Sequence, residues 1–99
     1  MSYPVAETIL QQLGGAGRVS VMTGANTFVA EPQALSFKFK GSRKANHVRI
    51  ELDKATDTYN VVFNKIVRYE PREVKAVEFI YWDQLKPLFE EVTGLYLTL

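Results

Sequence analysis

Hydrophobic and polar residues alternate along three consecutive stretches in the middle of the chain. Every second residue of these stretches is apolar: Leu35, Phe37 and Phe39, then Val48, Ile50 and Leu52, then Tyr59, Val61 and Phe63. Side chains on a β-strand point alternately to its two faces, so the pattern predicts strands with one buried and one solvated face. The connections, residues 41–46 and 53–58, are short and polar, which predicts an antiparallel meander.

A helical spacing marks both ends of the chain. Residues 4–13 carry one apolar stripe, and the glycines at 14 and 15 predict its end. Residues 83–93 carry a second stripe before Gly94. Asp83 is the expected N-cap of that helix, because its carboxylate can accept from unpaired backbone N–H groups. Pro87 falls at the end of the first turn, which indicates that the helix could begin a few residues later.

The remaining segments complete the predicted sheet. Residues 18–22 and 27–30 are expected to be short strands, and Pro71 is expected to interrupt the chain. Residues 73–81 predict a further strand whose apolar phase slips, which indicates either a bulge or burial on both faces. The sequence therefore predicts one α+β domain over residues 1–99. We expect a mostly antiparallel sheet of five or six strands, with the N-terminal and C-terminal helices packed on one face.

An apolar tail follows the last helix. It contains the residues Leu95, Tyr96, Leu97 and Leu99. Such a tail must dock on the core, pair as an edge strand or meet a partner, because an exposed apolar segment promotes aggregation. We therefore regard these four residues as a candidate interface.

Composition narrows the range of functions. The chain has 99 residues and no cysteine, so it offers neither a disulfide nor a thiolate. Its first residues do not resemble a signal peptide, and no apolar run approaches the roughly 20 residues of a membrane helix. We expect a cytoplasmic protein with no membrane association.

The residues that catalysis would require are sparse. His47 is the only histidine, it is expected on the solvated face, and no nucleophile elbow is present. Glu51, Asp53 and Asp57 lack the spacing of a calcium loop. The glycines at 14, 15 and 17 follow a helix and lack the lysine of a phosphate-binding loop. We expect no enzyme activity, no metal, no cofactor and no small-molecule substrate.

Charge is distributed unevenly along a chain whose net charge is only +1. Residues 32–50 contain five basic side chains and no acidic one: Lys38, Lys40, Arg43, Lys44 and Arg49. Strand alternation places several of them on the solvated face of one hairpin, where they could contact the phosphates of a nucleic acid. Phe37 and Phe39 face the core instead, which removes them as stacking partners. Edge lysines that keep a sheet soluble are the alternative interpretation.

Several sequence blocks suggest a family. They are Met22-Thr23-Gly24-Ala25 with Phe28, Leu35-Ser36-Phe37, Asn46-x-Val48-x-Ile50-x-Leu52, Asp57-Thr58-Tyr59 with Phe63, Asp83-Gln84-Leu85 with Phe89, and Thr93-Gly94-Leu95-Tyr96. With these blocks the chain, from Leu10 onward, resembles small uncharacterised proteins encoded by tailed phages, prophages and mobile elements. Trp82 and Pro87 depart from that pattern. The resemblance implies a cytoplasmic bacterial or phage setting and carries no activity or site residue.

Two functional hypotheses follow from the sequence. The first is a non-catalytic protein-interaction module that binds a protein partner or forms a homodimer through the tail or an open sheet edge. The second is a nucleic-acid-binding accessory protein that uses the basic hairpin.

Overall fold

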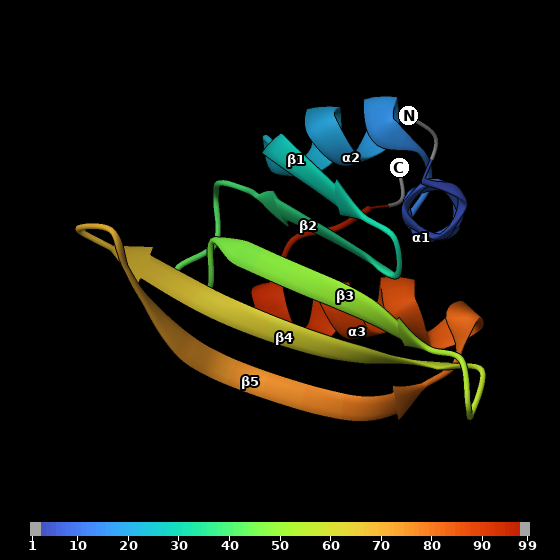
Figure 1. Cartoon of the computed structure of the whole chain (residues 1–99). Helices are drawn as coiled ribbons and strands as arrows, with labels where there is room; N and C mark the ends of the chain where they lie inside the picture. The colour runs from blue at the N-terminus through green and yellow to red at the C-terminus, as the bar shows by residue number, and fades with distance from the viewer. Residues whose placement is uncertain (1–2, 98–99) are drawn as a thin grey trace.

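The computed structural model describes residues 3–97, which form one antiparallel sheet and a set of helices (Figure 1). The elements in chain order are α1 (Pro4–Gln12), α2 (Ala16–Thr23), β1 (Asn26–Glu31), β2 (Ala34–Lys38), β3 (His47–Asp53), β4 (Thr58–Val67), β5 (Glu70–Ile80), the 3-10 helix η1 (Trp82–Gln84) and α3 (Leu85–Thr93). The five strands lie in the order β1-β2-β3-β4-β5, each antiparallel to the next. The predicted α+β class and antiparallel meander are confirmed.

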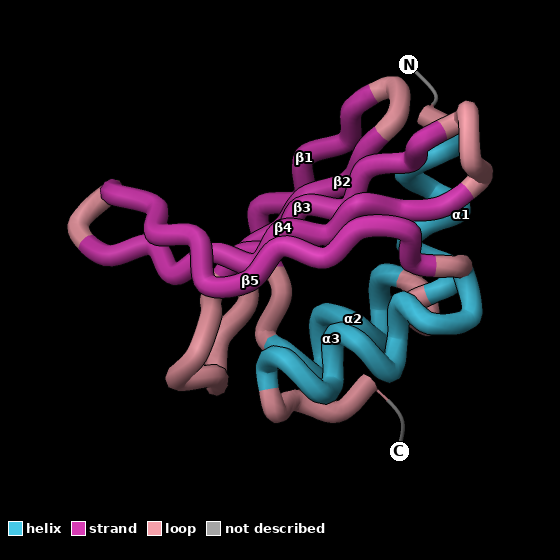
Figure 2. The backbone as a smooth tube through the Cα atoms, turned by 90° about the horizontal axis from the view of Figure 1, so that it is seen from below, coloured by secondary structure: helices cyan, strands magenta, loops and turns pink. Residues whose placement is uncertain are grey.

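All helices cover the same face of the sheet (Figure 2). The register explains why: Leu35 pairs with Ile50 and Ile50 with Val61, so one rung of apolar side chains crosses three strands. Burial of these side chains against the helices supplies the main driving force for folding. The prediction that the N-terminal and C-terminal helices share one face is confirmed, and α2 joins them there.

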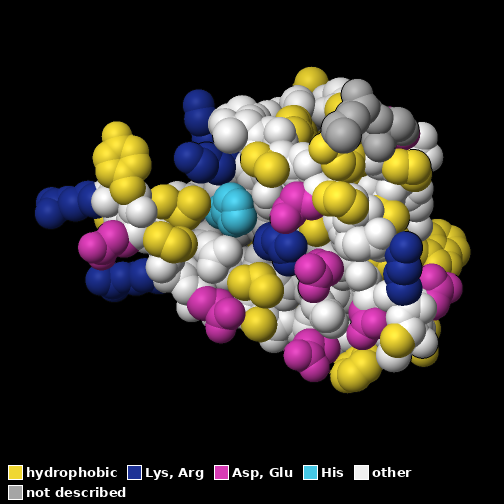
Figure 3. All heavy atoms as spheres, viewed as in Figure 1, with side chains coloured by type: hydrophobic (Ala, Val, Ile, Leu, Met, Phe, Trp, Pro, Cys, Tyr) yellow, Lys and Arg dark blue, Asp and Glu magenta, His cyan; other side chains and the backbone are white. Residues whose placement is uncertain are grey.

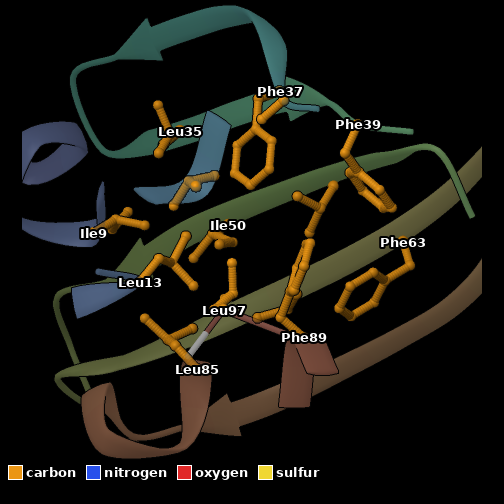
Figure 4. Packing of buried hydrophobic residues seen from close by; sticks show 14 of the residues in the cluster. Ile9, Leu13, Leu35, Phe37, Phe39, Ile50, Phe63, Leu85, Phe89 and Leu97 are labelled. Carbon is orange, nitrogen blue, oxygen red and sulfur yellow. The ribbon is translucent and has the colours of Figure 1, made fainter. Parts of the chain in front are cut away.

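Phe89 of α3 is the centre of the core (Figure 4). Its ring centroid lies 5.1 Å from that of Phe39, 6.1 Å from that of Phe37 and 6.2 Å from that of Phe63. Tilted and edge-on ring pairs at such distances add to the stabilisation from burial alone. This cluster joins the last helix to β2, to the loop after it and to β4.

Residues 18–22 form most of α2, so the predicted strand there is wrong. The helix begins after Gly15 and ends at Gly24, whose φ of 66° is the left-handed conformation that favours glycine. Val19 and Thr23, four residues apart, are buried, while Val21 is 83% exposed. Burial at a spacing of four residues indicates a helix, and it outweighs the strand propensity of the valines.

Pro71 does not interrupt the chain, in contrast to the prediction. It is the second residue of β5 and lies opposite Ile66 of β4. A proline is tolerated there because β5 is an edge strand with no partner on its other side. The predicted phase slip is confirmed as a bulge: four residues of β5, from Val77 to Ile80, lie opposite three residues of β4, from Tyr59 to Val61.

The C-terminal helix begins two residues later than predicted, with η1 in front of it. Asp83 lies inside η1 and is not an N-cap. Pro87 is the third residue of α3, where its missing N–H costs no bond within the helix. None of the helices in residues 3–97 has the length and apolar character needed to cross a membrane.

Candidate functional site

The β2–β3 loop and the β4–β5 turn lie at the same end of the sheet, and both carry positive charge. We call this region the basic end and define it by the residues Lys38, Lys40, Arg43, Lys44, Lys65, Arg68 and Arg72. Figure 3 shows Lys and Arg side chains gathered over this end of the molecule, around the projecting tip of the β4–β5 hairpin. Each of the seven lacks an ion pair with any other residue in 3–97.

A concavity of about 500 Å³ lies at the basic end. Its lining residues are Asn26, Lys38, Phe39, Lys40, Asn46, Ile66, Arg68 and Tyr69. Three cations and two aromatic rings therefore surround one hollow whose lining contains no carboxylate. Lys38 and Lys40 were predicted from the sequence, whereas Arg68 and Tyr69 were not. Lys65 and Arg72, which face each other in the register, lie on the other face of the hairpin.

Hydrogen bonds hold the β2–β3 loop in place against two elements. The Asn46 side chain donates to the Ile66 carbonyl at 2.9 Å and accepts from the Ile66 N–H at 2.7 Å, which ties the loop to β4. The Ser42 hydroxyl donates to the Thr93 carbonyl at 2.7 Å, which ties it to α3. Arg43 and Lys44 are exposed residues of this anchored segment, so the fold fixes the position of their backbone.

The β4–β5 turn has an unusual backbone. Arg68 and Tyr69 link Val67 to Glu70 with φ values of 52° and 68°. A two-residue hairpin turn with positive φ at both positions normally uses Asn-Gly, because larger side chains are strained there. Tyr69 is nevertheless 98% exposed and contributes nothing to the core. In the sequence, two runs of strand-forming residues separated by two positions could have indicated this hairpin. Arg-Tyr is not a typical turn sequence, so the turn was not predicted.

His47 and Lys38 are cross-strand neighbours on the open face of the sheet. Burial, and then the charge of Lys38, lower the pKa of His47 below 6.5. The neutral imidazole can accept at Nδ1 from the Asn64 amide, 3.3 Å away. His47 therefore contributes a neutral polar group beside the basic end.

Arg49 was predicted to belong with the hairpin cations, but the structure places it in an ion-pair cluster. Its guanidinium lies 3.2 Å from both Glu31 and Glu51. The hydrogen bond to Glu31, followed by smaller attractive contributions from both carboxylates, raises the pKa of Arg49 despite partial burial. Two carboxylates neutralise its charge, so Arg49 is not among the cations free to meet a phosphate.

The C-terminal tail folds back on the core. Leu97 is fully buried and its N–H donates to Glu90 Oε2 at 2.7 Å, while Leu95 packs partly against the core. Tyr96 is 69% exposed, and Leu99 lies outside the described residues. Docking of the tail on the core was one of the three arrangements expected from the sequence. In this fold Leu97 is a core residue, and Tyr96 is exposed.

A group of exposed aromatic residues lies at the opposite end of β5. Phe79, Tyr81 and Trp82 are 61%, 58% and 64% exposed. We call these three residues the aromatic surface. Trp82 also lines a smaller hollow of about 330 Å³ with Tyr59, whose pKa is raised chiefly by burial, so its phenol stays protonated. Strand alternation in residues 73–81 predicted burial for part of that strand, so an exposed aromatic surface was not expected there.

Metal-binding side chains do not cluster in the described part of the chain. Residues 3–97 contain no cluster of three or more His, Asp or Glu side chains placed to hold a metal ion. The concavity offers ammonium and guanidinium groups, amides and a phenol. These groups suit anion binding and aromatic stacking.

No known protein family matches this chain, and no curated protein or solved structure matches it. We therefore infer the function from the chemistry of the protein surface. The basic end and the aromatic surface lie at opposite ends of β5, and each presents to solvent side chains whose chemistry burial does not explain.

Proposed function

We propose that this protein binds nucleic acid through the basic end, as a non-catalytic accessory protein. The observation that carries the proposal is the convergence of Lys38, Lys40 and Arg68, from two separate hairpins, on one concavity without a carboxylate in its lining. Lys and Arg side chains arranged in this way neutralise phosphates and release counterions, which favours binding to a polyanion.

The distribution of charge in three dimensions supports the proposal. Seven basic residues and two acidic ones, Glu70 and Glu73, give the basic end an excess of five positive charges, while the rest of the chain carries an excess of four negative charges. The net charge of +1 hides this separation. Such a field orients the protein as it approaches a polyanion and directs the basic end toward it.

Like charges placed opposite each other on the β4–β5 hairpin support the proposal further. Lys65 lies directly opposite Arg72 in the β4–β5 register, and like charges at that position weaken a hairpin. A phosphate bound on that face of the hairpin, outside the concavity, would relieve the repulsion. Phosphate binding thus explains why two cations lie opposite each other, an arrangement that destabilises the folded hairpin.

The setting that we propose is the cytoplasm of a bacterium, with a phage or mobile element as the source of the chain. The support for it is the sequence resemblance to small phage-encoded proteins. Nucleic acid is abundant in that setting, which is compatible with the chemistry of the basic end.

The experiment is a binding titration with a labelled oligonucleotide at two salt concentrations. We expect affinity to fall steeply between about 50 mM and about 200 mM salt. The double variant Lys38→Glu and Lys40→Glu should lose most of the binding. Lys54→Glu with Lys86→Glu is the matched control, because it changes the net charge equally at positions outside the concavity. Equal losses in the two double variants, or no binding at low salt, would refute the proposal.

A protein-interaction role remains the second candidate, and the aromatic surface favours it. Exposed Trp and Tyr side chains are enriched at the centres of protein interfaces. A homodimer through Phe79 and Trp82 should appear by light scattering at high concentration and should dissociate when both are changed to Ser. A wild-type protein that stays monomeric would remove self-association from consideration.

A further inference from the structure

We propose that the bound nucleic acid is single-stranded, with one base stacked on Tyr69 and its neighbouring phosphates held by Lys38, Lys40 and Arg68. This inference rests on the proposed function and specifies its ligand. Tyr69 and the three cations line the same concavity, so one nucleotide could contact all of them.

Folding gives no reason for a tyrosine at position 69. The ring is 98% exposed, so it adds nothing to the core, and its backbone φ of 68° is strained for a side chain of this size. Backbone strain of this kind is concentrated at ligand-binding sites, where the side chain has a role outside the fold. An exposed aromatic ring among cations provides a stacking surface for a base.

The form of the concavity favours an unpaired base. Its volume of about 500 Å³ matches sites for ligands of nucleotide size. A base that enters it to reach Tyr69 must leave its complementary strand. A duplex would lose base pairing and stacking in that step, whereas a single strand already presents its bases.

The rest of the lining favours binding without sequence preference. Phe39 and Ile66 supply an apolar floor. The two amide side chains are engaged by the protein itself: Asn46 with the backbone of Ile66, and Asn26 with the Gly24 carbonyl and the Thr27 hydroxyl. Recognition of base edges needs such amides free, while stacking accepts any base.

The β4–β5 hairpin suggests a competing mode. A two-stranded ribbon fits the major groove of duplex DNA, and this hairpin projects beyond the helices (Figure 2). In that mode Arg68 would contact a duplex, and Lys38 and Lys40 would be set back from it. Comparing single-stranded and duplex DNA of the same length separates the two modes.

The test measures affinity for an oligothymidylate, for a duplex and for an abasic oligomer of the same length. Wild type should bind the single strand most tightly. Tyr69→Ala should weaken that binding by about 5- to 150-fold, the range for loss of one stacked base. Tyr69→Phe should retain it, because the ring is preserved. Tyr81→Ala, an exposed tyrosine at the far end of β5, is the matched control and should change little.

The abasic oligomer provides the decisive comparison. Because it keeps phosphates and lacks bases, Tyr69→Ala should bind it as well as wild type does. An unchanged affinity of Tyr69→Ala for oligothymidylate, or tighter binding of the duplex by wild type, would overturn the inference. If Lys38→Glu with Lys40→Glu still loses binding in that case, phosphate binding survives and only the stacking inference fails. No binding of any oligomer at low salt would remove both.

Discussion

Arg49 of β3 reaches across β2 to Glu31 of β1, with its Nε 3.2 Å from Glu31 Oε2. In the register Arg49 lies opposite Ser36 of β2, and Glu31 lies opposite Ala34, two residues along the same strand. The same guanidinium donates to Glu51 Oε2 at 3.2 Å. The open face of the sheet therefore carries a neutralised arginine in its middle and unpaired cations at one end, a difference that strand alternation alone does not reveal.

Replacing Arg49 tests whether its charge is available to a ligand. Arg49→Gln should cost at most about 1 kcal/mol of stability, because all three partners are more than a third exposed and solvent screens the pairs. Its effect on oligonucleotide affinity should be smaller than that of Lys38→Ala. Chemical denaturation and a binding titration measure the two effects. An Arg49→Gln variant that loses more affinity than Lys38→Ala would place Arg49 in the binding surface after all.

His47 should make the stability depend on pH in a defined direction. Burial and Lys38 lower its pKa in the folded protein below the unfolded value of 6.5, so the unfolded chain binds the proton more readily. The free energy of unfolding should fall as the pH drops from 6.5 through the folded pKa, and this contribution should be constant above pH 6.5. His47→Gln should lack the contribution. Urea unfolding of both proteins at about pH 8 and about pH 5 tests this; equal losses would contradict it.

The strained turn predicts a trade between stability and binding. Replacing Arg68-Tyr69 with Asn-Gly should stabilise the fold by about 1–2 kcal/mol, because these residues suit positive φ at both positions. The same change should weaken oligonucleotide binding, since it removes a cation and the stacking ring. Thermal unfolding and binding are measured on the same sample. A variant that is less stable than wild type would show that the turn is not strained.

The tail should behave as part of the core. Leu97→Ala should cost about 2–5 kcal/mol, the usual range for truncating a fully buried leucine. Tyr96→Ala should change stability by less than about 0.5 kcal/mol, because its side chain is exposed. Denaturant midpoints of the two variants give the comparison. A small effect of Leu97→Ala would mean that the tail does not dock as described.

The sequence predicts most of the sheet, because one face of each central strand is buried. Leu35, Ile50 and Val61 share a rung of the core, and that burial imposes the alternation seen in the sequence. The segment that forms α2 is the exception, because its sequence predicts a strand. Arg18 to Met22 alternates like a strand, whereas Val19 and Thr23 are buried one helical turn apart, with Val19 in the common core.

The candidate site was only half predictable. Lys38 and Lys40 follow from alternation within one hairpin. Arg68 and Tyr69 belong to a turn that extends past the helices, where no burial imposes a pattern, and Pro71 suggested a break. The concavity arises because two hairpins far apart in the sequence end side by side, which depends on strand order. The neutralisation of Arg49 by Glu31 likewise depends on the pairing of β1 with β2.

Mapping the contact surface by NMR tests the central claim most directly. Unlabelled oligothymidylate is titrated into uniformly ¹⁵N-labelled protein, and the amide shift changes are followed residue by residue. We predict the largest changes in residues 38–46 and 65–70, around the concavity, with little change at Phe79, Tyr81 and Trp82. Changes centred on the aromatic surface, or no changes at low salt, would contradict the assignment of the basic end as a nucleic-acid-binding surface.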